Sequence, residues 1–151
     1  MNKYVGILGL ALLLAACNDE EAGKTNAENE GNVVATTGQI ADAVKIISGD
    51  KLNVTTLMGP GVDPHLYKAT QSDMKVLDDA EVIFYNGLHL EGQLNDIFEQ
   101  MSKDKTVFAA AEVLAADKLL EDEEDNSLHD PRVWFDIELW KDVVDGIGDT
   151  L

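Results

Sequence analysis

Four short apolar runs alternate with helical patterns, and this alternation constrains the fold more than any other feature. The runs are rich in β-branched and aromatic residues, as buried strands are. They cover residues 33–37, 52–58, 81–85 and 106–109. Between the runs, apolar residues recur at intervals of three and four. The first such stripe consists of Ile40, Ala43, Val44 and Ile47. This order predicts an α/β fold, in which a four-stranded parallel sheet is flanked by helices.

The loop after the second predicted strand carries the best candidate for metal binding. It reads Gly59-Pro60-Gly61-Val62-Asp63-Pro64-His65-Leu66-Tyr67, so two prolines and two glycines shape the backbone around one imidazole. Ligands of parallel sheets bind beyond the carboxyl ends of the strands, where this loop begins. A neutral imidazole suits zinc and manganese-class ions, which makes His65 the candidate ligand. Asp63 is expected to fix the loop by bonding its backbone.

The first 32 residues predict export and membrane attachment. Lys3 and the apolar run after it form a signal that is too short to span a bilayer. The signal ends in Leu14-Ala15-Ala16-Cys17, which resembles the lipobox of bacterial lipoproteins. Residues 1–16 are therefore expected to be a lipoprotein signal peptide and Cys17 the lipidation site. The polar stretch 17–32 is then a disordered tether. An ordinary signal peptide with an incidental cysteine is the alternative.

Charge and composition exclude some classes of partner. Acidic residues outnumber basic ones by 29 to 11, and the resulting net charge of −18 argues against a nucleic-acid partner. The single cysteine excludes an internal disulfide. The acidic run at 121–125 is expected to be a solvated loop, because contiguous acids lack the alternating pattern of a calcium loop.

Other candidate residues are given structural roles. His89 is expected at a helix start and His129 in a polar loop, while Trp134 and Phe135 are expected in the core. The sequence shows no Ser-His-Asp spacing and no phosphate loop. A metal hydrolase would need several clustered carboxylates and histidines with a base beside a bound water. The chain is therefore not expected to be an enzyme.

Three motifs in order resemble the manganese- and zinc-binding solute receptors of bacterial ABC transporters, some of which are also described as lipoprotein adhesins. The motifs are residues 59–67, 86–91 and 130–136. The resemblance implies two α/β lobes joined by one long helix, with the metal held between them by two ligands from each lobe. It implies that residues 33–135 are the amino-terminal lobe and that residues 136–151 begin the connecting helix.

The resemblance also implies a role for individual residues. His65 matches the first metal ligand of the family, whereas Arg132 stands where the second ligand is normally a histidine. Guanidinium stays protonated and offers no lone pair, so Arg132 cannot bind the ion. His129 replacing it as a ligand is an open alternative. Two further ligands would come from the second lobe.

The implied function is that of the substrate-binding lipoprotein of an ABC importer for manganese or zinc, here with an impaired site. Its partners would be the divalent metal ion, the ABC permease and the bacterial cell membrane, to which a lipid anchor holds it on the side facing away from the cytoplasm. The alternative is a vestigial or adhesin-like surface lipoprotein that acts in interactions without metal transport.

Overall fold

A computed structural model gives the structure of the protein and describes residues 31–151 apart from residue 124. The predicted signal peptide, Cys17 and most of the tether lie outside the described residues. Within the described part of the chain, no helix is long and apolar enough to cross a membrane.

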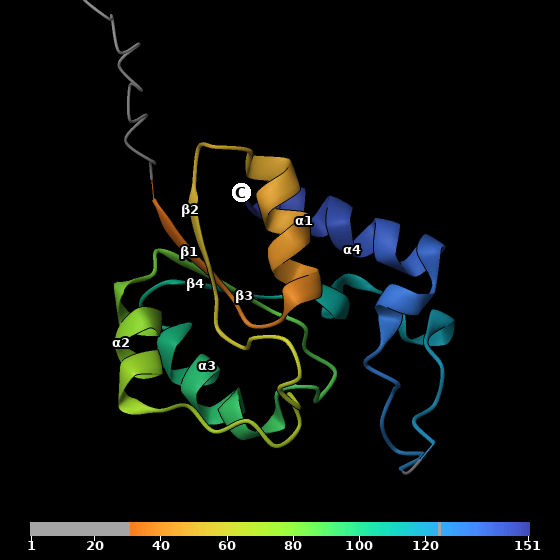
Figure 1. Cartoon of the computed structure of the whole chain (residues 1–151). Helices are drawn as coiled ribbons and strands as arrows, with labels where there is room; N and C mark the ends of the chain where they lie inside the picture. The colour runs from red at the N-terminus through yellow and green to blue at the C-terminus, as the bar shows by residue number, and fades with distance from the viewer. Residues whose placement is uncertain (1–30, 124) are drawn as a thin grey trace, which may run out of the picture.

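Four short parallel strands form the sheet, in the order β2-β1-β3-β4 (Figure 1). Their bounds are β1 Asn32–Ala35, β2 Asn53–Thr56, β3 Val82–Tyr85 and β4 Thr106–Ala109. The central strand β1 pairs with β2 and β3, so Val34 lies beside both Thr55 and Ile83. The predicted parallel α/β sheet is confirmed, although the first two strands end before the apolar runs do.

Helices cover both faces of this sheet. The α-helices are α1 Gly38–Ser48, α2 Gln71–Asp79, α3 Asn95–Met101 and α4 Ile137–Thr150. Short 3₁₀ helices are η1 Gly92–Leu94, η2 Ala110–Val113, η3 Ala116–Lys118 and η4 Val133–Phe135. Helices α1 and α4 lie on one side of the sheet, and α2 and α3 lie on the other (Figure 1).

Alternation along β1 produces two apolar cores, because successive strand residues point to opposite faces. Val33 and Ala35 pack with α1 and with Val143 and Ile147 of α4. Val34 packs on the opposite face with α2 and α3. Helix α4 thus shares a core with the sheet, and whether it also continues as a connecting helix stays a prediction.

Helix α2 is held at both ends by side-chain bonds. At its start, Thr70 and Asp73 form a capping box, in which each side chain accepts from the backbone amide of the other residue. At its end, the Lys105 ammonium donates to three carbonyl oxygens, those of Leu77, Asp78 and Ala80, at 2.8, 2.7 and 2.9 Å. A cation suits this position because the carbonyls at a helix C-terminus carry partial negative charge.

One predicted helix is interrupted. The apolar stripe from Leu90 to Met101 predicts a continuous helix, and its members Leu90, Leu94 and Phe98 are indeed buried. The chain nevertheless forms η1 first, and α3 begins only at Asn95. The reason is local: the Glu91 carboxylate turns back to accept bonds from the backbone of the preceding turn.

We predict that Lys105→Met lowers the free energy of unfolding by about 1–2 kcal/mol, because three carbonyl groups lose a charged donor. Urea denaturation of both proteins measures the difference. Lys103→Met is the matched control, since the Lys103 ammonium bonds only the side chain of Gln100 at the surface. An equal effect of the two substitutions would show that the bonds to the three carbonyl groups do not add to the free energy of unfolding.

Candidate functional site

An open cleft of about 820 Å³ lies at the carboxyl edge of the sheet. The turn after β1, the loop after β2 and the segment before α4 all contribute to its walls. These segments are far apart in sequence, but a parallel sheet brings the carboxyl ends of its strands to one edge. The residues that matter most for its chemistry are Thr37, Gly38, Asp42, His65, Arg132 and Trp134.

Hydrogen bonds fix the loop 59–67 along its length. Its approach is tied to the sheet, since the Met58 amide donates to the Thr36 carbonyl at 2.9 Å. Gly61 has a φ of +83°, a left-handed conformation that disfavours other residues. The His65 amide donates to Asp63 Oδ1 at 3.0 Å, which confirms the expected role of Asp63. The loop is therefore held before any ligand is present.

The end of the loop is clamped to the capping box of α2. The Tyr67 hydroxyl donates to Asp73 Oδ2 at 2.7 Å, and the Thr70 amide donates to the same oxygen at 2.7 Å. Burial and the bond to Asp73 raise the pKa of Tyr67 to about 12. The bonds from Thr70 and Tyr67 lower the pKa of Asp73. The clamp therefore stabilises an ionised Asp73 and a protonated Tyr67.

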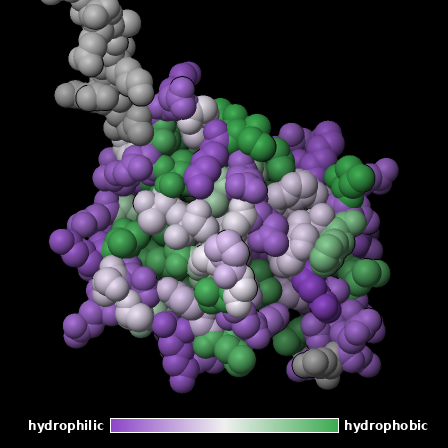
Figure 2. Space-filling view, in the orientation of Figure 1, coloured by the Kyte–Doolittle hydropathy of each residue, from purple (hydrophilic) through white to green (hydrophobic). Residues whose placement is uncertain are grey.

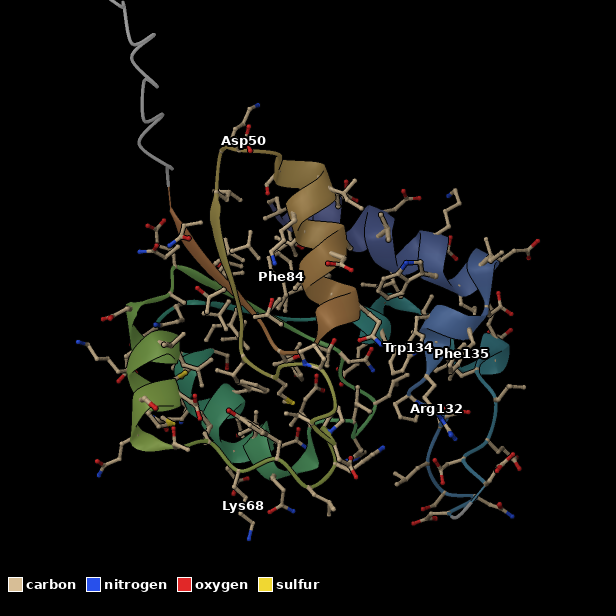
Figure 3. All side chains as sticks on the ribbon, in the orientation of Figure 1. Asp50, Lys68, Phe84, Arg132, Trp134 and Phe135 are labelled. Carbon is tan, nitrogen blue, oxygen red and sulfur yellow. The ribbon has the colours of Figure 1, made fainter. Side chains whose placement is uncertain are left out.

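His65 and Arg132 both line the cleft, and both are exposed. The Arg132 side chain extends towards the acidic hairpin around residues 121–129 (Figure 3). Its Nε donates to Asp130 Oδ1 at 2.8 Å, and its amide donates to the same oxygen at 2.9 Å. The bond to Asp130 raises the pKa of the Arg132 guanidinium. The cation is thus held at the wall of the cleft by the Asp130 carboxylate, and the charges of Glu123 and Asp122 also raise its pKa.

The other two histidines, both in the described part of the chain, do not line the cleft. His129 pairs with Glu121 in an antiparallel bridge, is not among the residues lining the cleft, and its buried Nδ1 has no hydrogen-bond partner among the described residues. His89 is exposed, has a φ of +63° and lines a separate hollow with Tyr85. It precedes η1, whose N-cap is Glu91. His65 is therefore the histidine that the described structure places in the cleft.

The prediction that Trp134 and Phe135 lie in the core is wrong for Phe135. That side chain is 81% exposed, and it contacts the Trp134 ring at a centroid distance of 5.9 Å. Trp134 is half-buried and lines the cleft instead of sitting in the core. The reason is that both residues lie on the short helix η4, whose single turn buries Val133 towards the sheet.

The described members of the acidic run at 121–125 are mostly exposed, as expected.

The described residues do not form a complete metal site. No group of three or more histidine, cysteine, aspartate or glutamate side chains among them is arranged to hold an ion. Zinc takes about four ligands in structural sites and three protein ligands in catalytic ones. The cleft offers the His65 imidazole, which is one ligand of a type that suits such ions.

Sequence reasoning missed a buried polar cluster behind the cleft, formed by Thr36, Asn86 and Glu91. All three are at most 1% exposed. The available signal was Glu91 itself, an acid enclosed by Leu90 and Leu94 in an apolar stripe. Its position there is unusual, because glutamate is rarely buried without partners.

Comparison with known proteins identifies similar chains. The profile of the family described as "Zinc-uptake complex component A periplasmic" (ZnuA) matches residues 33–151. The manganese-binding lipoprotein MntA of Bacillus subtilis is 46% identical over 141 residues, which cover 93% of this chain and 45% of MntA. The zinc-binding protein TroA of Treponema pallidum is 39% identical over 145 residues, covering 96% of this chain and 46% of TroA. The chain thus spans less than half the length of these relatives.

Solved structures agree in fold. The periplasmic zinc-binding protein TroA of Treponema pallidum superposes with a TM-score of 0.76 at 42% identity, over 80% of this chain and 43% of that one. A manganese-bound periplasmic metal-binding protein from Candidatus Liberibacter asiaticus superposes with a TM-score of 0.70 at 26% identity, over 80% of this chain and 44% of that one.

We predict that Asp73→Asn lowers the free energy of unfolding by about 1 kcal/mol at pH 7, because the clamp loses its charged acceptor. The native pKa of Asp73 lies below its ordinary value of 3.8. The ionised form therefore stabilises the fold above that value, and the contribution is lost as the pH falls through the lower, native pKa.

Urea denaturation at pH 7 and at successively lower pH checks this, and the difference between the two proteins should shrink as the pH falls below 3.8. Asp50→Asn is the control, since Asp50 is exposed in the turn after α1. A gap between wild type and Asp73→Asn that stays constant down to the lowest pH would contradict the assignment.

Proposed function

This chain belongs to the family of the periplasmic zinc-uptake complex component A, whose members are solute-binding proteins and not enzymes, and from that premise we propose that it is a metal-receiving lobe of an ABC importer for manganese or zinc. The substrate is the divalent ion itself. Its destination is the membrane permease of the importer. In this proposal, the ion is captured at the carboxyl edge of the sheet and passed on without chemical change.

The observation that carries the proposal is the position of His65. The loop 59–67 is fixed by its own hydrogen bonds and presents one imidazole to a cleft of about 820 Å³. Imidazole binds both proposed ions. Relatives at 46% and 39% identity are named for manganese and zinc binding, respectively, so the names support both ions as candidates.

Arg132 weakens the proposed site electrostatically. A unit positive charge at about 4 Å from a divalent ion opposes binding by several kcal/mol, even at an effective dielectric constant of roughly 20. The Asp130 carboxylate, 2.8 Å from Arg132 Nε, offsets part of this repulsion. Arg132 is also unable to supply the ligand that a histidine would supply. The proposed lobe therefore binds its ion weakly through His65.

Attachment to the membrane is the second part of the proposal. Several relatives are named lipoproteins, including MntA of Bacillus subtilis and the manganese transporter component scaA of Streptococcus gordonii. The lipobox at residues 14–17 supports the same modification of Cys17 here. Acyl chains on Cys17 would hold the lobe at the outer face of the membrane, close to the permease.

Calorimetry tests metal binding directly. We predict that the chain without its signal peptide binds Mn²⁺ and Zn²⁺ with dissociation constants weaker than about 1 μM, because one imidazole beside a fixed cation is a poor site. His65→Ala should remove the remaining binding, whereas the control His89→Ala should leave it unchanged. Sub-micromolar binding by the wild type would refute the weak site. Binding that survives His65→Ala would refute the proposed ligand.

A set of Arg132 substitutions separates charge from ligation. We predict that Arg132→His raises zinc affinity by about tenfold or more, because it removes the cation and adds a second imidazole beside the same cleft. Arg132→Gln should give a smaller gain, since it only removes the charge. Arg132→Lys, which keeps the charge, should give none. Equal affinities across the three variants would show that residue 132 does not face the bound ion.

A further inference from the structure

The turns around the cleft meet at one buried carboxylate. Glu91 is 1% exposed and accepts three hydrogen bonds. The Thr36 hydroxyl donates to Oε1 at 2.6 Å, the Asn86 amide to Oε1 at 2.9 Å and the Gly87 amide to Oε2 at 3.2 Å. Glu91 thus joins the end of β1 to the turn after β3, across 55 residues of sequence.

Asn86 extends this connection to the Arg132 segment. Its side-chain amide donates to the Pro131 carbonyl at 3.0 Å and to the Gly87 carbonyl at 3.1 Å. Pro131 is buried and directly precedes Arg132. Glu91 bonds the Asn86 backbone and the Asn86 side chain bonds Pro131, so two consecutive hydrogen bonds link Glu91 to the residue before Arg132.

Thr36 extends the connection in the other direction. The Thr36 carbonyl accepts from the Met58 amide at 2.9 Å, directly before the loop that carries His65. The next residue, Thr37, lines the cleft and precedes α1. The same carboxylate is therefore linked to both walls of the cleft, one with His65 and the other with Arg132.

A simple stabilising role does not account for an acid at this position. The pKa of Glu91 lies above its ordinary value, because the effect of burial outweighs the opposing effect of the bonds from Thr36, Asn86 and Gly87. No ion pair with Glu91 occurs among the described residues. A buried charge without a counter-ion is costly, and an apolar residue would fill the core more favourably. A carboxylate has two acceptor oxygens and no donor, so it can accept from Thr36, Asn86 and Gly87 at once.

We propose that Glu91 is a positioning residue for the metal cleft, holding the Arg132 segment and the approach to the His65 loop in fixed places at the edge of the sheet. This inference rests on the proposed function of the cleft. Its physical content, the coupling of Glu91 to residues 131–136, holds with or without a metal. Among the described residues, the Glu91 side chain makes no hydrogen bond to His65 or Arg132, so its effect on the cleft is indirect.

The test uses two substitutions in the chain without its signal peptide. Glu91→Gln keeps the shape but turns a donor towards one of the backbone amides, and Asn86→Ala removes the bond to the Pro131 carbonyl while leaving the Glu91 carboxylate in place. Glu99→Gln, an exposed glutamate on α3, is the matched control. Because Asn86→Ala acts on the same connection, it decides the test if Glu91→Gln fails to fold.

The readouts are local NMR signals. Trp134 lines the cleft and its indole reports on the segment, whereas the amides of α2, on the opposite face of the sheet from α1 and α4, serve as the internal reference. We expect both substitutions to shift the Trp134 indole signal. Amide hydrogen exchange at Phe135 and Asp136 should become about tenfold faster, because an anchoring bond is lost. The amides of α2 should not change, and the control should match the wild type.

Two results would overturn the proposal. One is an unchanged Trp134 signal and unchanged exchange in the folded variants. The other is an equal change throughout α2, which would mean that Glu91 only stabilises the whole fold. Neither readout uses a metal. A wild-type chain that binds no ion would therefore refute the proposed function and leave the result on Glu91 standing.

Discussion

The pairing of strand β1 with neighbours on both sides is the constraint on which the rest of the molecule depends. Its backbone bonds to β2 and β3 in parallel register, and its alternating side chains supply one core on each face. A parallel arrangement brings the turn after β1, the loop after β2 and the turn after β3 to one edge. The cleft is a consequence of this topology, and the charged and polar groups at that edge decide what it binds.

The surface of the molecule combines a strong acidic charge with exposed apolar groups. Hydrophilic side chains cover most of the rim of the visible face, with hydrophobic patches over the end of α1 and near the start of α4 (Figure 2). The exposed apolar side chains there include Ile46, Phe135 and Ile137. A net charge of −18 attracts cations at long range, although salt screens this field beyond about 10 Å. Within the cleft, the fixed charge of Arg132 acts in the opposite direction.

The sheet, most helix positions and the His65 loop could be predicted from sequence because each depends on local pattern. The β-branched runs, the Thr70–Asp73 capping box and the prolines around His65 act within a few residues of chain. Phe135 was misassigned because hydrophobicity alone does not say which face a single 3₁₀ turn presents to the core. The Glu91 cluster was missed because Thr36 lies 55 residues away in sequence, directly after β1, and only the folded sheet brings its hydroxyl to the carboxylate.

Manganese is paramagnetic, and its effect on nearby amide signals locates even a weakly bound ion, so an NMR titration tests most directly whether the ion binds at His65. With a small fraction of Mn²⁺ added to the chain without its signal peptide, broadening should be strongest in residues 59–67 around His65. This pattern should disappear in His65→Ala. Broadening centred on the acidic residues 121–125, with the His65 loop unaffected, would show that His65 does not bind the ion.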